Sequence, residues 1–355
     1  TNEVLRIAER VQQKFGIPFD LRGHEVYSSA SIGILHASEK HTSSEDMMRD
    51  ADTAMYQAKR AGKARHEVFD DEMHSVAKET LRLETDLRRA VEREEIQVYY
   101  QPIYSLKTGE IECFESLARW DHPALGKIAP TKFIPLAEEI GLIDRLCSQV
   151  LRRACREIGS LKDRATDQNN FSVSVNLSCR QFGQSSLVSN IENILSDTGF
   201  APNKLKLEIT ESVFFEHQDR AVGMLNQLRD NGIEINIDDF GTGYSNLGYL
   251  KKLPVSALKI DRSFVSMIDS KGNNDEIVRA IITLSRNLGL SVIAEGIETE
   301  TQLEILKKMD CEGGQGFLFA KPMAFDDLCE FLANENVANI PSQRFGDVTN
   351  VPLIQ

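Results

Sequence analysis

From Ile96 onward, short apolar runs alternate with segments long enough to form helices. Strand and helix that alternate this often over about 240 residues are typical of a parallel barrel. The fold class that we predict is therefore α/β, a TIM-like (β/α)8 barrel. The predicted strands are Val98–Tyr104, Cys113–Arg119, Ser172–Leu177, Leu205–Ile209, Ile233–Asp238, Ala257–Ile260, Ser291–Ala294 and Gly316–Phe319. The predicted helical segments between them include Pro130–Leu151, Arg180–Thr198 and Asp275–Leu288.

The connection between the first two predicted strands does not follow this pattern. Only a short segment that contains Leu106–Glu110 separates these strands. A crossover between parallel strands needs about a dozen residues or more, whereas a short turn joins antiparallel strands. We therefore predict a barrel whose first strand is antiparallel to its neighbours.

The first 70 residues contain a different succession of elements. We expect an amphipathic helix over Val4–Phe15, a buried strand over Val26–Ile34, a helix over Ser44–Arg60 and a short strand over His66–Phe69. Two helices and two strands bury little surface for an independent core. Residues 1–70 are therefore expected to be part of an α+β domain.

The remaining domain boundaries follow from local composition. Residues 71–94 are charged and have apolar residues at near-helical spacing, which predicts a connecting helix with one apolar side. Such a helix could also carry a signal between domains. We expect the barrel to cover residues 95–335 and a loose C-terminal tail to cover residues 336–355.

Composition excludes several classes of protein. The chain has 41 Lys+Arg against 54 Asp+Glu, a net charge of −13, so we expect it not to bind nucleic-acid polymers. It has no apolar stretch long enough to span a bilayer and no signal peptide, which predicts no membrane segment. Six scattered cysteines without a C-x-x-C pair indicate reduced thiols in a cytoplasmic protein.

Polar side chains recur at or near the ends of the predicted barrel strands. The C-terminal ends of parallel barrel strands converge at one rim, so we expect these side chains to share one space. A single acidic residue at a strand end is usually a helix N-cap, and that interpretation stays open for each residue alone. Capping does not explain the whole set, which is Glu115, Asn176, Glu208, Asp238, Asp239, Lys259, Asp261, Glu295 and Gln315.

Oxygen donors without histidine or cysteine favour Mg²⁺ or Mn²⁺. Neighbouring strand residues point to opposite faces, so Asp238 and Asp239 can both turn to the pocket only where the strand gives way to a loop. Gly241 and Gly243 follow at once and permit such a bend. One aspartate could then bridge two ions about 3.5–4 Å apart. Lys259 is suited to orienting a water molecule or neutralising phosphate charge.

Residues 94–335 resemble the EAL-domain phosphodiesterases, which linearise cyclic di-GMP. The signature triplet reads Glu115-Ser116-Leu117 here, with serine where the family has alanine. Because the glutamate is kept, we expect this change to affect only the packing of the pocket. The motifs that carry the resemblance are ESLARW (115–120), VNLS (175–178), EITES (208–212), IDDFGTGYSNL (237–247), LKIDRSFV (258–265), AEGIET (294–299) and QGFLFAKP (315–322).

The resemblance implies a role for each matching residue. Asp238 would be shared by two ions of Mg²⁺ or Mn²⁺, Glu295 would be a ligand and the general base, and Lys259 would contact the attacking water with the support of Asp261. The implied metal ligands are Glu115, Asn176, Glu208, Asp238, Asp239 and Glu295. The implied substrate contacts are Gln101, Leu117, Arg119, Gln315 and Pro322.

The resemblance also implies a loop that couples dimerisation to metal loading, and hence a homodimer through the barrel. For Glu211, an exposed carboxylate at a helix start remains the alternative interpretation. The residues implied in this coupling are Glu211, Phe240, Gly241, Thr242 and Gly243.

Residues 1–70 resemble the C-terminal half of a GGDEF domain, through ASIGIL (30–35) and DADTAMYQAKRAGKARHEVF (50–69). The GGDEF signature itself is absent from the sequence, so we expect no diguanylate cyclase activity from these residues.

Together the residues and the resemblance predict an enzyme that hydrolyses cyclic di-GMP to linear pGpG by two-metal, in-line attack of water, which would lower cyclic di-GMP signalling. The alternative is a catalytically inactive receptor for cyclic di-GMP. A third hypothesis, based on the fold alone, is another metal-dependent barrel enzyme that stabilises an enolate.

Overall fold

The computed structural model describes residues 2–22, 24–37, 43–161, 171–211, 213, 218–242, 250–268 and 275–334. It contains two compact units, Thr1–Arg88 and Arg89–Gln355. None of the described helices has both the length and the apolar composition needed to cross a membrane. Two of the predictions, Gly243 and the tail over residues 336–355, lie outside the described residues.

The first unit contains two small pairs of strands. Strands β1 and β2 form an antiparallel hairpin, and β3 pairs in parallel with β4. The prediction of one buried strand over Val26–Ile34 was wrong, because β2 ends at Val26 and β3 begins at Ile32. Between them Tyr27 is 71% exposed and small residues follow, so no apolar face holds this stretch in a sheet. The elements are α1 (Asn2–Phe15), β1 (Phe19–Leu21), β2 (His24–Val26), β3 (Ile32–Ile34), α2 (Ser44–Arg60) and β4 (His66–Val68).

Helix α3 (Asp71–Glu92) ends at the start of the second unit. Its last carbonyl groups are held by helix α5 (Ile143–Ser160), because Gln149 Nε2 donates to the carbonyl of Val91 at 2.7 Å. Arg145 donates to the carbonyl of Glu92 at 3.4 Å. Carbonyls that a helix end leaves without intrahelical partners are thus satisfied by side chains.

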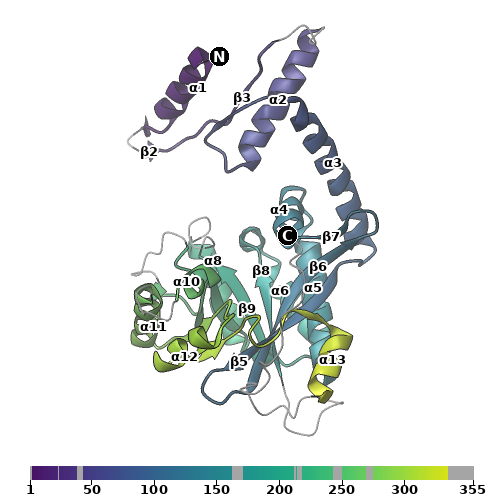
Figure 1. The fold of residues 1–355 in the computed structure, drawn as a ribbon, viewed down its shortest axis with the longest axis vertical. Coiled ribbons are helices and arrows are strands. Elements are labelled where there is room, and N and C mark those ends of the chain that lie inside the picture. Colours follow the sequence, from purple (N-terminus) through teal and green to yellow (C-terminus); the bar gives the residue numbers. More distant parts are fainter. Residues whose placement is uncertain are drawn as a thin grey trace. The chain divides into compact units, whose positions relative to one another are not determined.

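Eight strands of the second unit close into a barrel (Figure 1). Strand β5 pairs antiparallel with both of its barrel neighbours, β6 and β13, and the other barrel pairs are parallel. The predicted barrel with a reversed first strand is therefore confirmed. The barrel strands are β5 (Gln97–Ser105), β6 (Ile111–His122), β8 (Ser172–Leu177), β9 (Leu205–Thr210), β10 (Glu234–Phe240), β11 (Ala257–Ile260), β12 (Ser291–Ala294) and β13 (Gly313–Gly314).

Helices surround the barrel in Figure 1 and cover the outer side of its strands. On one side, Leu258 and Val292 of the strands belong to the same buried cluster as Val278 and Ile282 of a helix. Two short strands, β7 (Gly126–Ile128) and β14 (Met323–Ala324), pair antiparallel with β6 and β5, respectively. The remaining helices are α4 (Pro130–Glu139), α6 (Leu187–Thr198), α8 (Gln218–Asp230), α10 (Arg262–Ser266), α11 (Glu276–Leu288), α12 (Glu300–Lys308) and α13 (Phe325–Asn334).

The eighth barrel strand is shifted from its predicted place. The expected strand Gly316–Phe319 is wrong: that segment turns, and β13 consists of Gly313 and Gly314. The segment closes a turn instead, because the backbone N–H of Phe319 donates to the carbonyl of Gly316 at 3.1 Å. A Cβ atom on Gly316 would lie 2.1 Å from the carbonyl oxygen of Ile297, so the two backbone segments approach closely.

Candidate active site

The inner side of the barrel is built by alternation along the strands. Polar residues stand at every second position within apolar strands, and side chains at every second position face the same side. The register aligns Asn176 of β8 with Glu208 of β9 and Asn236 of β10. Glu115 of β6 lies beside Ser174 of β8. The strands thus place one row of polar groups next to another inside the barrel.

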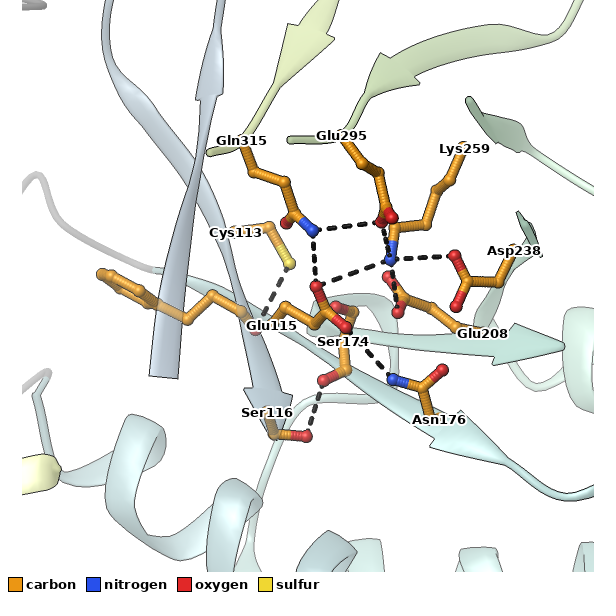
Figure 2. Close-up of polar contacts among 11 residues, drawn as sticks. Cys113, Glu115, Ser116, Ser174, Asn176, Glu208, Asp238, Lys259, Glu295 and Gln315 are labelled. Carbon is orange, nitrogen blue, oxygen red and sulfur yellow. Dashed lines mark hydrogen bonds and ion pairs between the residues drawn. The ribbon is translucent and has the colours of Figure 1, made fainter. Parts of the chain in front are cut away.

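Lys259 lies at the centre of the polar cluster, and its side chain is fully buried (Figure 2). Its Nζ atom is 2.6 Å from Glu295 Oε1 and 2.8 Å from Glu208 Oε2. The same atom is 3.2 Å from Asp238 Oδ1 and 3.5 Å from Glu115 Oε2. One ammonium group therefore faces four carboxylates, three from different strands and one from the residue that follows β12.

Two amide side chains complete the cluster. Gln315 Nε2 donates to Glu115 Oε2 at 2.6 Å and to Glu295 Oε1 at 3.0 Å. Asn176 Nδ2 donates to Glu115 Oε1 at 3.2 Å. Figure 2 shows these side chains pointing toward the same centre as Lys259. The structure thus brings together Glu115, Asn176, Glu208, Asp238, Lys259, Glu295 and Gln315, as the sequence predicted.

The cluster contains more negative than positive groups, and this imbalance shifts the pKa values of its members. Burial raises the pKa of Glu208 well above its usual value and that of Glu295 to about 8, and neighbouring carboxylates add to both effects. Burial works against the charged form of Lys259, but the carboxylates outweigh it and raise the pKa of Lys259. One cation is too little for this many carboxylates in a buried site.

Divalent cations fit this donor set. Glu208 Oε1 and Gln315 Oε1 are buried and have no hydrogen-bond partner among the described residues, which is costly for polar atoms away from water. Oxygens of Asp238, Asp239 and Glu295 lie within 4.8 Å of one another. Carboxylate and amide oxygens are the ligands that Mg²⁺ and Mn²⁺ prefer.

Asp238 and Asp239 both reach the cluster because β10 is irregular at this point. The pairing of β10 with β11 shifts between Ile237 and Phe240, and Asp239 has a left-handed φ of 53°. The sequence suggested that the strand gives way to a loop here. Instead, the strand continues to Phe240 with a bulge. A bulge of this kind redirects side chains that would otherwise alternate.

Asp261 has a different environment from the other carboxylates. It is the N-cap of α10, where it accepts hydrogen bonds from the backbone N–H and the hydroxyl of Ser263. Asp239 is its carboxylate neighbour: burial, followed by the charges of Asp238 and Asp261, raises the pKa of Asp239 to about 6. Among the described residues, the ion pairs of Lys259 do not include Asp261.

The predicted substrate contacts lie along β5, β6 and the segment after β13. Gln101 is the cross-strand partner of Glu115 and donates to the carbonyl of Ala320 at 3.0 Å. Leu117 and Arg119 follow Glu115 at alternate positions of β6, on the same face of the strand. Pro322 is half-buried just before β14. Burial lowers the pKa of Arg119, and the charge of Glu115 in the cluster acts in the opposite direction.

The loop after β10 is connected to the end of β9. Glu211 Oε1 accepts a hydrogen bond from the backbone N–H of Gly241 at 2.7 Å. Thr242 donates its hydroxyl to the carbonyl of Asp239 at 2.8 Å, and Phe240 is buried. The side chain of Glu211 is thus attached to this loop.

The sequence reasoning missed three polar residues of the site region. Ser174 and Asn236 are buried within the barrel, with side-chain atoms that have no hydrogen-bond partner among the described residues. Their signal was present, since each stands two residues before a predicted ligand in an otherwise apolar strand. Lys127 lies over the ring of Tyr99, as does Arg119. Lys127 is on β7, a strand of three residues that is too short to show an alternating pattern in the sequence.

Comparison with known proteins agrees with this architecture. The chain matches the model of the EAL domain over residues 84–322 and that of the diguanylate cyclase GGDEF domain over residues 1–65. It therefore belongs to the EAL-domain family, and the predicted GGDEF-like segment before the barrel is confirmed.

Two curated relatives come from Pseudomonas aeruginosa. The cyclic di-GMP phosphodiesterase NbdA is 38% identical over 92% of this chain and 41% of its own length. The bifunctional diguanylate cyclase/cyclic di-GMP phosphodiesterase MucR is 41% identical over 92% of this chain and 47% of its own length. The chain thus spans less than half of the length of these two relatives.

A solved structure has the same barrel. The complex of the PaMucR phosphodiesterase with c-di-GMP is 42% identical, with a TM-score of 0.66, and the match covers 70% of this chain and 99% of that chain.

Proposed function

We propose that this chain is a metal-dependent phosphodiesterase that hydrolyses cyclic di-GMP to linear pGpG and so lowers cyclic di-GMP signalling. The observation that carries this proposal is the convergence of buried carboxylates and amides from separate strands around one point, with too little positive charge. The names of NbdA and MucR, and the c-di-GMP complex of the latter, support the choice of substrate.

The proposed ligands divide into two groups that share Asp238. Glu115, Asn176, Glu208 and Asp238 would hold one ion of Mg²⁺ or Mn²⁺, and Asp238, Asp239 and Glu295 the other. Two such ions, when bound, lower the pKa of a water molecule and neutralise charge on a phosphate group. For Asn176 the oxygen would be the donor atom, with its Nδ2 kept on Glu115 as in the structure.

Two residues would act on the reacting atoms. Glu295 would accept a proton from the attacking water, a role that its raised pKa suits. Lys259 would place its ammonium group against the non-bridging phosphate oxygens. The water oxygen forms a bond to phosphorus, the bond from phosphorus to the 3′-oxygen breaks, and the 3′-oxygen takes a proton. Asp261, through Asp239 and the start of α10, would position this end of the site.

The other proposed roles concern the substrate. Gln101 and Arg119 would face the guanine base and the phosphate, and Leu117 and Pro322 would line the same side of the mouth. Gln315, which touches both Glu115 and Glu295, would orient the substrate or a water molecule.

Chromatography of the nucleotides after incubation of the chain with cyclic di-GMP tests the proposal. We expect pGpG only when Mg²⁺ or Mn²⁺ is added, and a loss of at least about 100-fold in rate for Glu115→Ala and Glu295→Gln. Glu304→Gln, an exposed glutamate of α12, is the matched control and should keep full activity. Robust turnover by either site variant would contradict the roles. Binding of cyclic di-GMP without pGpG in the presence of both metals would instead identify the inactive receptor.

We further propose that the chain forms a homodimer through the barrel and that the loop after β10 couples the dimer to metal loading. The hydrogen bond from the N–H of Gly241 to Glu211 supports the coupling, because Glu211 directly follows the strand that carries Glu208. Glu211→Ala should raise the Mg²⁺ concentration needed for half-maximal rate, whereas Glu211→Gln keeps an acceptor oxygen and should change it less. Sedimentation that shows a monomer at all concentrations would contradict the dimer.

We keep the domain boundaries as a proposal: a partial GGDEF-like domain over 1–70, a connecting helix over 71–94, the barrel over 95–335 and a tail over 336–355. A cytoplasmic location, with cyclic di-GMP as the small-molecule partner, belongs to the same proposal.

A further inference from the structure

A cavity of about 510 Å³ lies outside the barrel, beside helix α5 and the start of β5. Its lining includes four arginines of α5, Arg145, Arg152, Arg153 and Arg156. Their spacing of seven, eight and eleven residues from the first places all four on one face of the helix. The volume falls within the range of small-molecule sites, about 300–1,000 Å³.

The charge of this cavity is opposite to that of the chain. The whole sequence has a net charge of −13, yet the lining has four guanidinium groups against two carboxylates, Glu94 and Glu157. Glu157 already accepts hydrogen bonds from the hydroxyl of Tyr100 at 2.7 Å and from Arg153 at 2.8 Å. Glu94 is exposed at the rim. The cavity therefore concentrates positive charge in an acidic protein, which attracts anions.

Most of the guanidinium donors remain available to a ligand. Arg156 has no hydrogen bond or ion pair with any described residue, and Arg145 donates only to the backbone carbonyl of Glu92, at 3.4 Å. Arg152 forms one ion pair with Asp197, at 2.7 Å. Because each guanidinium has five N–H groups in a planar fork, these arginines can still bind several oxygen atoms.

The size of the cavity bears on which anion fits it. An inorganic anion alone would leave most of its volume of about 510 Å³ empty, whereas an organic molecule that carries an anionic group would fill it.

We propose that this cavity binds a phosphate-bearing organic molecule of about the size of a mononucleotide, with its phosphate on the arginines. A phosphate group can accept paired hydrogen bonds from several guanidinium groups. A carboxylate has only two oxygens and matches four guanidinium groups less well. The cavity shares no lining residue with the carboxylate cluster at the barrel mouth, so it would be a second site.

Isothermal titration calorimetry of the full chain in EDTA tests the proposal with three probes, GMP, AMP and inorganic phosphate. Without divalent cations, the carboxylates of the barrel mouth repel phosphate, so binding reports on the arginine cavity. We expect the nucleotides to bind more tightly than inorganic phosphate. Arg156→Ala and Arg145→Ala should each weaken nucleotide binding about tenfold, because each removes a charged hydrogen bond.

Arg229→Ala is the matched control, since Arg229 is an exposed arginine of α8 away from the cavity, and it should bind like the unchanged chain. Arg156 has no partner to lose, so its substitution should leave the thermal midpoint unchanged. Glu295→Gln should keep nucleotide binding although we expect it to lose hydrolysis, which separates this site from the proposed activity.

Three outcomes would overturn the proposal. The first is that no nucleotide binds. The second is that the double variant Arg145→Ala/Arg156→Ala binds nucleotides as tightly as the unchanged chain. The third is that nucleotides bind no more tightly than inorganic phosphate.

Discussion

Lys259 occupies the position that a cation would take among the carboxylates of the barrel. Its Nζ atom is within 3.5 Å of oxygens from Glu115, Glu208, Asp238 and Glu295, and its side chain is fully buried. A buried carboxylate group without an opposite charge costs several kcal/mol or takes up a proton. Lys259 is therefore a counter-ion of these carboxylates as well as a candidate catalytic residue.

Lys259→Met tests this dual role through stability. In EDTA at pH 8 we expect the variant to lose about 3–5 kcal/mol of unfolding free energy, because four buried carboxylates lose their partner. Added Mn²⁺ should restore most of the loss, since divalent cations neutralise the same groups. Urea unfolding with and without Mn²⁺ measures both quantities.

Lys206→Met is the matched control for this experiment. Lys206 is also a strand lysine of the barrel, paired with Glu234 at 3.0 Å, but it does not touch the cluster. The variant should lose less stability, and Mn²⁺ should restore none of the difference. Equal rescue of both variants would show that Mn²⁺ acts elsewhere on the chain.

At the scale of elements, the bulge of β10 and the glycine after it determine where the two aspartates point. Gly241 has φ of 96°, and a Cβ atom there would lie 3.0 Å from Cε2 of Phe264. Only glycine adopts this backbone region without strain.

Gly241→Ala should therefore destabilise the chain by about 1–2 kcal/mol and lower the rate of hydrolysis, as measured by thermal unfolding and nucleotide chromatography. The matched control is Gly223→Ala in the middle of α8, where a Cβ atom meets nothing within 4 Å. That change should stabilise the chain by about 0.5–1 kcal/mol, because alanine is the better helix residue. A stable Gly241→Ala variant would mean that the loop has another accessible conformation.

The strands that the sequence placed well are those with apolar outer faces. Ser172–Leu177 and Ala257–Ile260 have the predicted bounds, since their apolar residues pack beneath helices. Strand β13 could not be found in this way, because its two glycines have no side chains to form a pattern. The alternation of residues along the strand also did not predict the bulge at Asp239, although the paired aspartates and Gly241 indicated an irregular strand end.

For the whole molecule, the two units differ greatly in the apolar surface they bury. Among the described residues, the buried apolar side chains of the first unit are Ala8, Ile34, Ala54, Ala58 and Leu87. The same unit leaves large apolar residues such as Ile7, Phe19 and Leu21 exposed. Because apolar burial is the main source of stability, the first unit should unfold before the barrel.

Urea unfolding followed by two probes should separate these events. Circular dichroism reports the helices of both units, including α1 and α2, and should show an early loss of signal. Trp120 is the one tryptophan of the chain and is buried in the barrel unit against Phe133, so its fluorescence should change only at the later transition. Coincident transitions would show that the two units unfold together.

The features that the sequence predicted correctly are those to which many residues contribute. The eight-strand barrel and its reversed first strand follow from repeated patterns and one short connection, and Lys259 with the surrounding carboxylates follows from strand ends that must converge. The arginine cavity did not emerge, because Arg145 and Arg156 look like ordinary charges on an exposed helix. Only the shape of the surface beside α5 distinguishes them.

The reversed direction of β5 has a consequence for how the barrel is connected to what comes before it. In a barrel of parallel strands, the chain joins the first strand at the end opposite to the chemistry. Here Gln97, the first residue of β5, pairs with Arg119 near the end of β6, so the chain enters at the rim that gathers the carboxylates. Gln101, four residues further along, is already the neighbour of Glu115. A shift in the last turn of α3 would therefore reach the carboxylate cluster along a single short stretch of backbone, without crossing the barrel.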